Sequence, residues 1–199
     1  EKWIWLRLKL IADIGLIGLP NAGKSTLLSR VTAAKPKIAD YPFTTLHPNL
    51  GVVHQDNKEF VIADIPGLIE GAYGGSGLGH RFLGHVERCK GLLHLIDATS
   101  ENIKEDYLTI IKEIEAYDSN LSKKKQIIVL TKSDAVKEQK LNFAKEQLKK
   151  LNVQKVFGIS SVSGENITKL VRQLQELISS MKKIEDDEDH LQEVSSWSP

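Results

Sequence analysis

Apolar residues in this chain form short, nearly continuous runs that alternate with longer segments of helical periodicity. The run from Leu92 to Ile96 is an example, and such a run suits a strand that is covered on both faces. The pattern predicts six strands, at Ile11–Leu16, Gly51–His54, Phe60–Asp64, Gly91–Asp97, Gln126–Leu130 and Lys155–Ile159. It predicts five helices, at Gly23–Ala33, Gly79–Arg88, Asn102–Tyr117, Lys137–Leu151 and Asn166–Met181.

The alternation of strands and helices predicts an α/β fold: a six-stranded, mostly parallel sheet that is doubly wound, with helices on both faces. The polar segment Gln55–Lys58 predicts a hairpin between the second and third strands. Ligands of such sheets bind at the carboxyl ends of the strands. We therefore expect the functional residues at that edge.

Composition narrows the class of protein. The chain has 199 residues, with 41% hydrophobic and 27% charged residues, which is typical of one soluble globular domain. The net charge of +1 gives no global field that would favour nucleic acid or membrane. No apolar run reaches the ~18 residues of a membrane span. A single cysteine, Cys89, cannot form an internal disulfide and fits a reducing cytosol.

The two ends of the chain differ from the middle, which we expect to be one domain over residues 11–181. The chain begins with Glu1 rather than Met, and residues 1–10 are interpreted as a linker from a missing N-terminal domain. Residues 182–199 contain the acidic run Glu185–Asp189, which predicts a disordered tail. A specific interaction tail is the alternative.

Residues Gly18 to Ser25 fit the phosphate-binding pattern G-x-x-x-x-G-K-[ST], directly between a predicted strand and a predicted helix. Gly18 and Gly23 allow the backbone N–H groups to point at phosphates, and the helix N-terminus adds its positive dipole end. Lys24 is expected to reach the β- and γ-phosphates, and the Ser25 hydroxyl to bind Mg²⁺. The alternative is a glycine-rich turn with a helix-capping serine.

The third predicted strand ends in a D-x-x-G pattern, from Asp64 to Gly67. A carboxylate at this strand end can hold a Mg²⁺-bound water, and the Gly67 amide would meet the γ-phosphate. Such a sequence is also a good turn. Its distance downstream of the phosphate-binding loop favours the metal interpretation.

Two segments have the composition of nucleotide-dependent switches. Six glycines fall within the thirteen residues from Gly67 to Gly79, so this segment could be ordered by a γ-phosphate and released without it. A passive flexible loop is the alternative. In Lys35–Leu50, a threonine is expected to complete the Mg²⁺ coordination, and Thr44 and Thr45 are both candidates.

Base recognition is predicted after the fifth strand. The residues Thr131-Lys132-Ser133-Asp134 resemble an N-K-x-D signature with threonine in place of asparagine. Asp134 would accept hydrogen bonds from guanine N1–H and the 2-amino group, and would repel adenine. The Lys132 stem can pack along the base. Because Thr131 is short and lacks an amide, we expect one contact to the base or the phosphate-binding loop to be lost, at a cost of about fivefold in affinity.

A second base loop is expected after the sixth strand, where Ser160-Ser161-Val162 resembles an S-A-x signature. The Ser161 amide is the candidate donor to guanine O6.

Five motifs in this order resemble the Ras-like GTPase superfamily. The strings Gly18–Thr26, Ala34–Leu46 and Asp64–Ala72 are similar to those of the Obg family, and the resemblance covers roughly Leu6 to Met181. It implies a cytoplasmic GTPase that acts in large ribosomal subunit assembly and stress signalling, with a glycine-rich N-terminal domain that would contact the large subunit. It also implies binding of guanosine tetraphosphate. No stable oligomer and no membrane span are predicted.

Carried over residue by residue, the resemblance selects Thr45, and it makes Ser25, Thr45 and Asp64 the Mg²⁺ set and Asn21, Lys24, Thr45 and Gly67 the catalytic set. The full predicted nucleotide-contact set consists of Gly18, Leu19, Pro20, Asn21, Ala22, Gly23, Lys24, Ser25, Thr26, Phe43, Thr44, Thr45, Leu46, His47, Asp64, Ile65, Pro66, Gly67, Thr131, Lys132, Ser133, Asp134, Ser160, Ser161 and Val162.

The position after the D-x-x-G motif, where many such enzymes orient water with glutamine, is Leu68. We therefore predict slow intrinsic hydrolysis. Asn21 resembles the asparagine that binds K⁺ in related GTPases, where K⁺ stabilises transition-state charge; a loop-shaping role is the alternative. Leu68 also leaves open a nucleotide sensor (GTP, GDP or guanosine tetraphosphate) that barely turns over. A third reading, an RNA-contact domain, is disfavoured by the net charge of +1.

Overall fold

The computed structural model describes residues 10–32, 37–38, 48–65, 84–153 and 155–195, with backbone only for 37–38 and 182–195. The strands are β1 (Ala12–Ile17), β2 (Lys37–Ile38), β3 (Asn49–Gln55), β4 (Lys58–Asp64), β5 (Cys89–Asp97), β6 (Gln126–Thr131) and β7 (Val156–Gly158). The helices are α1 (Lys24–Val31), α3 (Ile103–Tyr117), α4 (Glu138–Lys149) and α5 (Ile167–Ser195), with short 3₁₀ helices η2 (Leu121–Lys123) and η3 (Ser133–Ala135).

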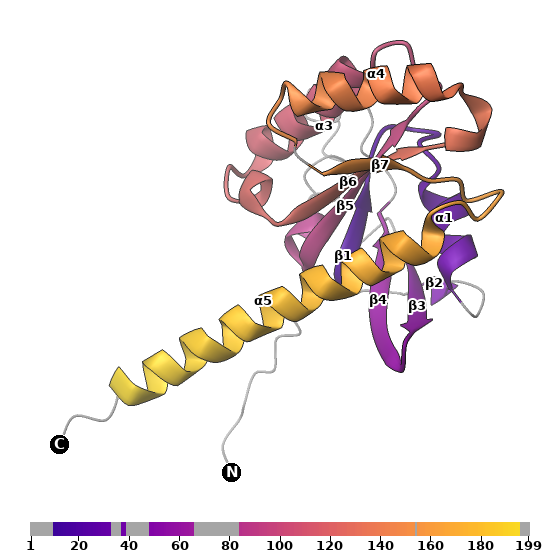
Figure 1. Ribbon diagram of the computed structural model, residues 1–199. Helices are drawn as coiled ribbons and strands as arrows, with labels where there is room; N and C mark the ends of the chain where they lie inside the picture. The colour runs from indigo at the N-terminus through magenta and orange to yellow at the C-terminus, as the bar shows by residue number, and fades with distance from the viewer. Residues whose placement is uncertain (1–9, 33–36, 39–47, 66–83, 154, 196–199) are drawn as a thin grey trace.

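One sheet with the order β2-β3-β4-β1-β5-β6-β7 forms the centre of the molecule (Figure 1). The five neighbouring strands β4, β1, β5, β6 and β7 pair in parallel. Strand β3 pairs antiparallel with both β4 and β2. The predicted mostly parallel α/β sheet is therefore confirmed. All six predicted strands are present, and β2 adds a two-residue seventh strand that is too short to carry a periodic signal.

The predicted hairpin between β3 and β4 is also confirmed. Gln55 pairs with Lys58 across the turn, and the two turn residues, Asp56 and Asn57, have φ values of 48° and 60°. Two consecutive left-handed residues are typical of the two-residue turns whose twist matches the flanking strands.

Helices cover both faces of the sheet, as predicted. On one face, Leu27 and Leu28 of α1 and Leu174 of α5 pack with Ile14 and Leu93. The opposite face is covered by α3 and α4. Its two hydrophobic clusters consist of Ile11, Ala12, Ile17, Ala63, Ile65, Val86, Cys89, Leu92, Ile110, Ile114 and Leu121, and of Ile96, Ala98, Ile103, Tyr107, Ile128, Leu130, Ala144, Leu148 and Val153.

Helix α5 is longer than predicted. The prediction ended it at Met181, but the backbone is helical to Ser195, and its last part extends well beyond the sheet (Figure 1). The segment that we expected to be disordered is thus helical as far as Ser195. The stretch Ile167–Ser195 contains no glycine or proline and is rich in Glu, Lys and Leu, so nothing in it ends a helix.

Other expectations lie outside the described residues. These are the linker at residues 1–9, the last residues 196–199, and most of the predicted helix Gly79–Arg88, of which residues 84–87 are helical. Within the part of the chain that the structure describes, no helix is both long enough and apolar enough to cross a membrane.

Candidate functional site

The loop between β1 and α1 is shaped by two glycines. Gly18 has φ +147°, and a Cβ there would lie 2.4 Å from the carbonyl oxygen of Leu95. Gly23 has φ +90° and immediately precedes α1. Both conformations strain any residue with a side chain. The loop backbone therefore needs glycine at the two positions where the phosphate-binding pattern has it.

Lys24, at the start of α1, folds back over this loop. Its Nζ donates hydrogen bonds to the carbonyl oxygens of Gly18, at 2.8 Å, and Leu19, at 3.0 Å. Burial lowers the pKa of Lys24, and the nearby Asp64 carboxylate opposes that effect. The ammonium is thus partly desolvated and bound to neutral carbonyls. A phosphate at this position would supply the missing negative charge.

Ser25 and Asp64 meet beside the loop. The register of β1 on β4 places Leu16 opposite Asp64, so Asp64 ends its strand close to the loop. Ser25 Oγ donates a hydrogen bond to Asp64 Oδ2 at 2.5 Å, and Asp64 is only 3% exposed.

These two groups fit a magnesium ion. A hydroxyl that donates to a carboxylate keeps its lone pairs for a metal, and Mg²⁺ prefers such oxygen ligands. Among the described residues, no cluster of three or more His, Cys, Asp or Glu side chains could hold a metal ion. A metal beside Ser25 would depend instead on hydroxyl, carboxylate, phosphate and water oxygens.

Thr131, at the end of β6, contacts the phosphate-binding loop. Its Oγ1 donates to the carbonyl oxygen of Ala22 at 2.8 Å and lies 3.2 Å from that of Ile96. Thr131 is 2% exposed. Thr131 therefore keeps a contact to the phosphate-binding loop, because its short hydroxyl reaches the loop backbone directly. A contact of this residue with the base remains untested.

Replacing Thr131 with valine keeps its shape and removes the donor. Because the carbonyl of Ala22 would lose its partner, we expect the variant to lose about 1–2 kcal/mol of unfolding free energy. We also expect weaker binding of GDP, because the hydrogen bond that joins Thr131 to the phosphate-binding loop would be absent. Urea unfolding and GDP titration would measure both. An unchanged GDP affinity would show that this hydrogen bond does not contribute to nucleotide binding.

The two predicted base loops lie side by side. Ser133 donates its backbone N–H to the carbonyl oxygen of Ile159 at 3.1 Å, and its Oγ to Glu165 Oε2 at 2.9 Å. Ser160 is buried and donates its N–H to the carbonyl oxygen of Glu165. Glu165 thus joins both loops. Asp134 remains exposed, where it can meet a ligand.

Comparison with known proteins identifies the family. A sequence profile described as "50S ribosome-binding GTPase" matches residues 13–132, more than half of the chain. The chain belongs to this family. It is a Ras-like P-loop GTPase domain that binds guanine nucleotides. A second profile, described as ethanolamine utilisation–propanediol utilisation, matches residues 98–176.

Solved structures agree with this fold. Aquifex aeolicus Era bound to GDP·AlF4⁻ has a TM-score of 0.65 at 22% identity, over 83% of this chain and 56% of that one. Era in complex with MgGDPNP and nucleotides 1506–1542 of 16S ribosomal RNA has 0.64 at 25%, over 82% and 55%. The G domain of the T. maritima FeoB iron transporter has 0.61 at 24%, over 85% and 97%. The GTPase domain thus spans little more than half of the Era chains.

At the carboxyl edge of its sheet, the GTPase domain brings together most of the predicted site: Gly18, Leu19, Pro20, Asn21, Ala22, Gly23, Lys24, Ser25, Thr26, Asp64, Ile65, Thr131, Lys132, Ser133, Asp134, Ser160, Ser161 and Val162. The predicted residues that lie outside the described part of the chain are Phe43, Thr44, Thr45, Leu46, His47, Pro66 and Gly67. Their roles, like the individual roles of the others, remain predictions.

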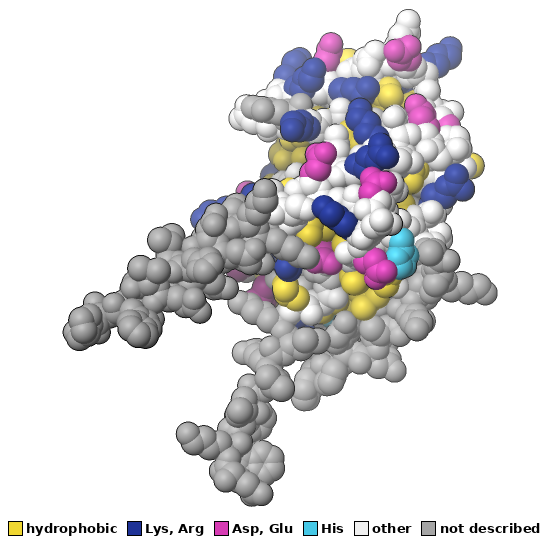
Figure 2. All heavy atoms as spheres, turned by 60° about the horizontal axis from the view of Figure 1, so that its bottom comes forward, with side chains coloured by type: hydrophobic (Ala, Val, Ile, Leu, Met, Phe, Trp, Pro, Cys, Tyr) yellow, Lys and Arg dark blue, Asp and Glu magenta, His cyan; other side chains and the backbone are white. Residues whose placement is uncertain are grey.

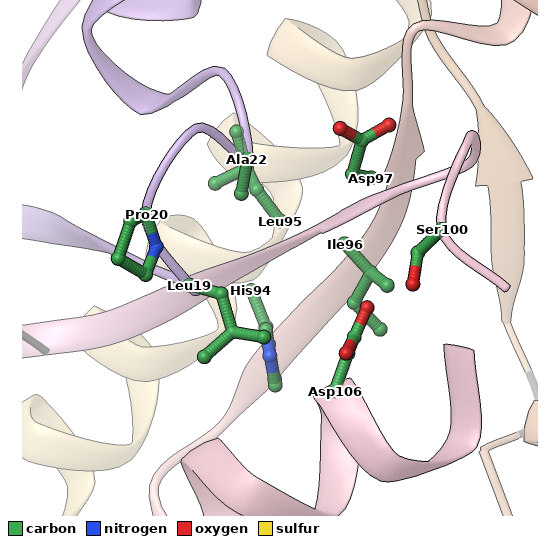
Figure 3. A pocket seen from close by; sticks show the side chains of 9 residues that line it. All are labelled: Leu19, Pro20, Ala22, His94, Leu95, Ile96, Asp97, Ser100 and Asp106. Atoms are coloured by element: carbon green, nitrogen blue, oxygen red, sulfur yellow. The ribbon is translucent and has the colours of Figure 1, made fainter. Parts of the chain in front are cut away.

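Beside the phosphate-binding loop lies a cavity of about 200 Å³. Figure 3 shows Leu19 and Pro20 on one side of it, and Ser100 and Asp106 on the opposite side. His94 also lines the cavity; it is 1% exposed, and its ring stacks on Tyr107 with a centroid distance of 5.3 Å. Among the residues that the structure describes, none forms a hydrogen bond with its Nδ1. Burial lowers the pKa of His94 to about 3, so a neutral imidazole lines the cavity beside the loop.

Sequence reasoning missed two residues of the site, Asp97 and Glu165. Asp97 could have been found by the argument that selected Asp64, because it also ends an apolar strand at the carboxyl edge. The contact of Glu165 with Ser133 gives no sequence signal, because it depends on how two loops pack.

Proposed function

We propose that this chain is the GTPase domain of an Obg-type molecular switch. It hydrolyses GTP to GDP and phosphate with Mg²⁺, in the cytoplasm, during assembly of the large ribosomal subunit and in the response to stress. Two findings support this: the three motif strings that resemble the Obg family, and the family profile described as 50S ribosome-binding GTPase.

The contact between Ser25 and Asp64 is the observation that carries the proposal. A hydroxyl and a buried carboxylate 2.5 Å apart, beside a lysine that lacks an anionic partner within the loop, fit a magnesium–phosphate pair. In this mechanism Lys24 neutralises charge on the β- and γ-phosphates. Ser25 and Thr45 would bind the metal, and Asp64 would hold one of its waters. Bound Mg²⁺ would supply positive charge at the phosphates.

Water attack needs a polar group that Leu68 does not provide. Asn21 is exposed at the tip of the phosphate-binding loop with φ 62°, a backbone conformation that asparagine tolerates better than most residues. Its side chain is therefore free to contact a second cation over the phosphates. We propose K⁺ for this position, where it would stabilise transition-state charge.

Phosphate release from GTP with Mg²⁺, in matched KCl and NaCl, tests the enzyme and the cation together. We expect slow turnover that rises at least about tenfold in KCl, and we expect Asn21→Ala to remove the KCl effect. Equal, slow release in both salts would exclude K⁺ activation. A single-turnover rate above about one per second in NaCl would contradict the role given to Leu68.

The same assay distinguishes the switch from a nucleotide sensor, the function that Leu68 also allows. A sensor would bind GDP and GTP but release no phosphate above background in either salt. A chain that binds neither nucleotide would exclude both functions.

The ribosomal role is the finer part of the proposal. The Era structure with 16S ribosomal RNA concerns that protein and the small subunit RNA. On the face of this GTPase domain shown in Figure 2, basic side chains are mixed with acidic ones, which does not favour extended RNA contact. As the resemblance to the Obg family implies, we propose that an N-terminal domain contacts the large subunit and that the GTPase domain controls this contact through its nucleotide. No stable oligomer is proposed.

A further inference from the structure

Lys132 is the residue predicted to pack along the guanine base, and its position has a conformational cost. Its backbone has φ 56°, in the left-handed region that a lysine seldom adopts. A lysine side chain also loses considerable rotamer entropy when it is fixed. A contact that holds this side chain in place before the base arrives would therefore strengthen nucleotide binding.

Asp97 provides such a contact. Lys132 Nζ lies 2.5 Å from Asp97 Oδ2. The other carboxylate oxygen, Oδ1, accepts the backbone N–H of Thr99 at 2.9 Å and its hydroxyl at 2.7 Å. Both oxygens of Asp97 are thus used, and the two bonds to Oδ1 fix the direction in which Oδ2 points.

The charge of Asp97 is maintained by these bonds. Partial burial would raise the pKa of Asp97, but the hydrogen bonds from Lys132 and Thr99 outweigh that effect and lower it. The carboxylate is therefore ionised at neutral pH, as an ion pair with Lys132 requires.

The ion pair lies at the predicted base site. Asp97 is opposite Thr131 in the register of β5 and β6, and Thr131 binds the phosphate-binding loop through Ala22. Asp97 and Ala22 line the same cavity (Figure 3). The carboxylate is thus next to the loop that would hold the phosphates and next to the loop that would hold the base.

We infer that Asp97 is a positioning residue for guanine recognition: it holds the Lys132 side chain in place so that the stem is ready to pack along the base. This role rests on the proposed function. Asp97 acts through Lys132 and does not contact the phosphates. The base is bound in the same way before and during hydrolysis, so loss of Asp97 weakens binding and leaves the chemical step unchanged.

Titration of GDP and steady-state hydrolysis of GTP by Asp97→Ala test this role. We expect the Kd for GDP and the KM for GTP to rise about tenfold, with kcat unchanged. Asp97→Asn keeps one acceptor oxygen for the two bonds from Thr99 but places an amide donor opposite the Lys132 ammonium, so it should weaken GDP binding about as much as Asp97→Ala does. Inosine diphosphate lacks the 2-amino group that Asp134 would bind but presents a similar ring to the Lys132 stem. Because Asp97 acts through that stem, Asp97→Ala should weaken the binding of inosine diphosphate and of GDP by the same factor.

Two further variants make the test specific. Asp106→Asn removes the same charge from another residue of the cavity that has no contact with Lys132, and its GDP affinity should match the wild type. In a double-mutant cycle, Asp97→Ala should have no effect on GDP affinity once Lys132 is alanine, because it acts through that side chain.

The outcomes separate the two claims. If the wild type binds GDP and Asp97→Ala binds it equally well, the positioning role is wrong and the proposed function stands. Additive effects of Asp97→Ala and Lys132→Ala, or a fall in kcat with unchanged KM, would also overturn this role. A wild type that binds no guanine nucleotide would overturn the proposed function and this role with it.

Discussion

Replacing Lys24 with methionine is expected to lower the affinity for GTP by at least about a hundredfold, because two charge-assisted contacts to phosphate are worth about 3 kcal/mol or more. Methionine keeps the length and the apolar stem of the side chain. In the absence of nucleotide the variant should unfold no more easily than the wild type, since burial already disfavours the charged form of Lys24 and the nearby Asp64 carboxylate only partly offsets that effect.

A matched control for the lost charge is Lys149→Met, on the exposed surface at the end of α4. It should bind GTP as the wild type does. Fluorescence titration of GTP and thermal unfolding without nucleotide would measure both effects. A Lys24→Met variant that retains wild-type affinity would mean that the anionic ligand does not bind at this loop.

The architecture could be predicted from the sequence because each strand carries its own local signal. The apolar runs within β1, β5 and β6 are covered on both faces, so they are mostly hydrophobic, and the hairpin between β3 and β4 is marked by polar turn residues. Errors occurred where no such signal exists. Strand β2 has two residues, and no glycine or proline marks where α5 ends.

The site was predictable to the extent that it follows from short motifs. The glycines of the phosphate-binding loop, Lys24 and Ser25 lie in eight consecutive residues, and Asp64 follows from the end of β4. Contacts between distant segments were not predictable. Thr131 is 109 residues from Ala22, and no local sequence signal indicates that its hydroxyl binds that carbonyl.

The pair of Lys132 and Asp97 shows the same limit. A left-handed lysine cannot be recognised from sequence, and neither can the rotamer that brings its ammonium to a carboxylate 35 residues away. Motifs therefore identify which residues can contact a ligand. The structure shows which other residues, such as Asp97 and Glu165, hold them in position.

Because of His94, the free energy of unfolding of this domain should fall steeply as the pH drops below about 6.5. Burial, with a smaller contribution from the charge of Lys24, lowers the pKa of His94 from 6.5 to about 3. Between these values the unfolded chain binds a proton that the folded one does not. The contribution of neutral His94 to stability is thus complete above pH 6.5 and is lost as the pH falls towards 3, amounting to about 2 kcal/mol by pH 5.

His94→Phe should remove this dependence, because phenylalanine does not titrate and can still stack on Tyr107. It also removes the Nδ1 atom, which has no hydrogen-bond partner within the described part of the chain, so the variant should be at least as stable as the wild type at pH 7. Guanidinium unfolding at pH 7 and pH 5 would measure the difference between the two proteins, which should widen in favour of the variant by about 2 kcal/mol. Parallel losses of stability in both proteins would show that His94 takes up its proton without unfolding, and that the cavity behind the phosphate-binding loop admits enough water to solvate an imidazolium.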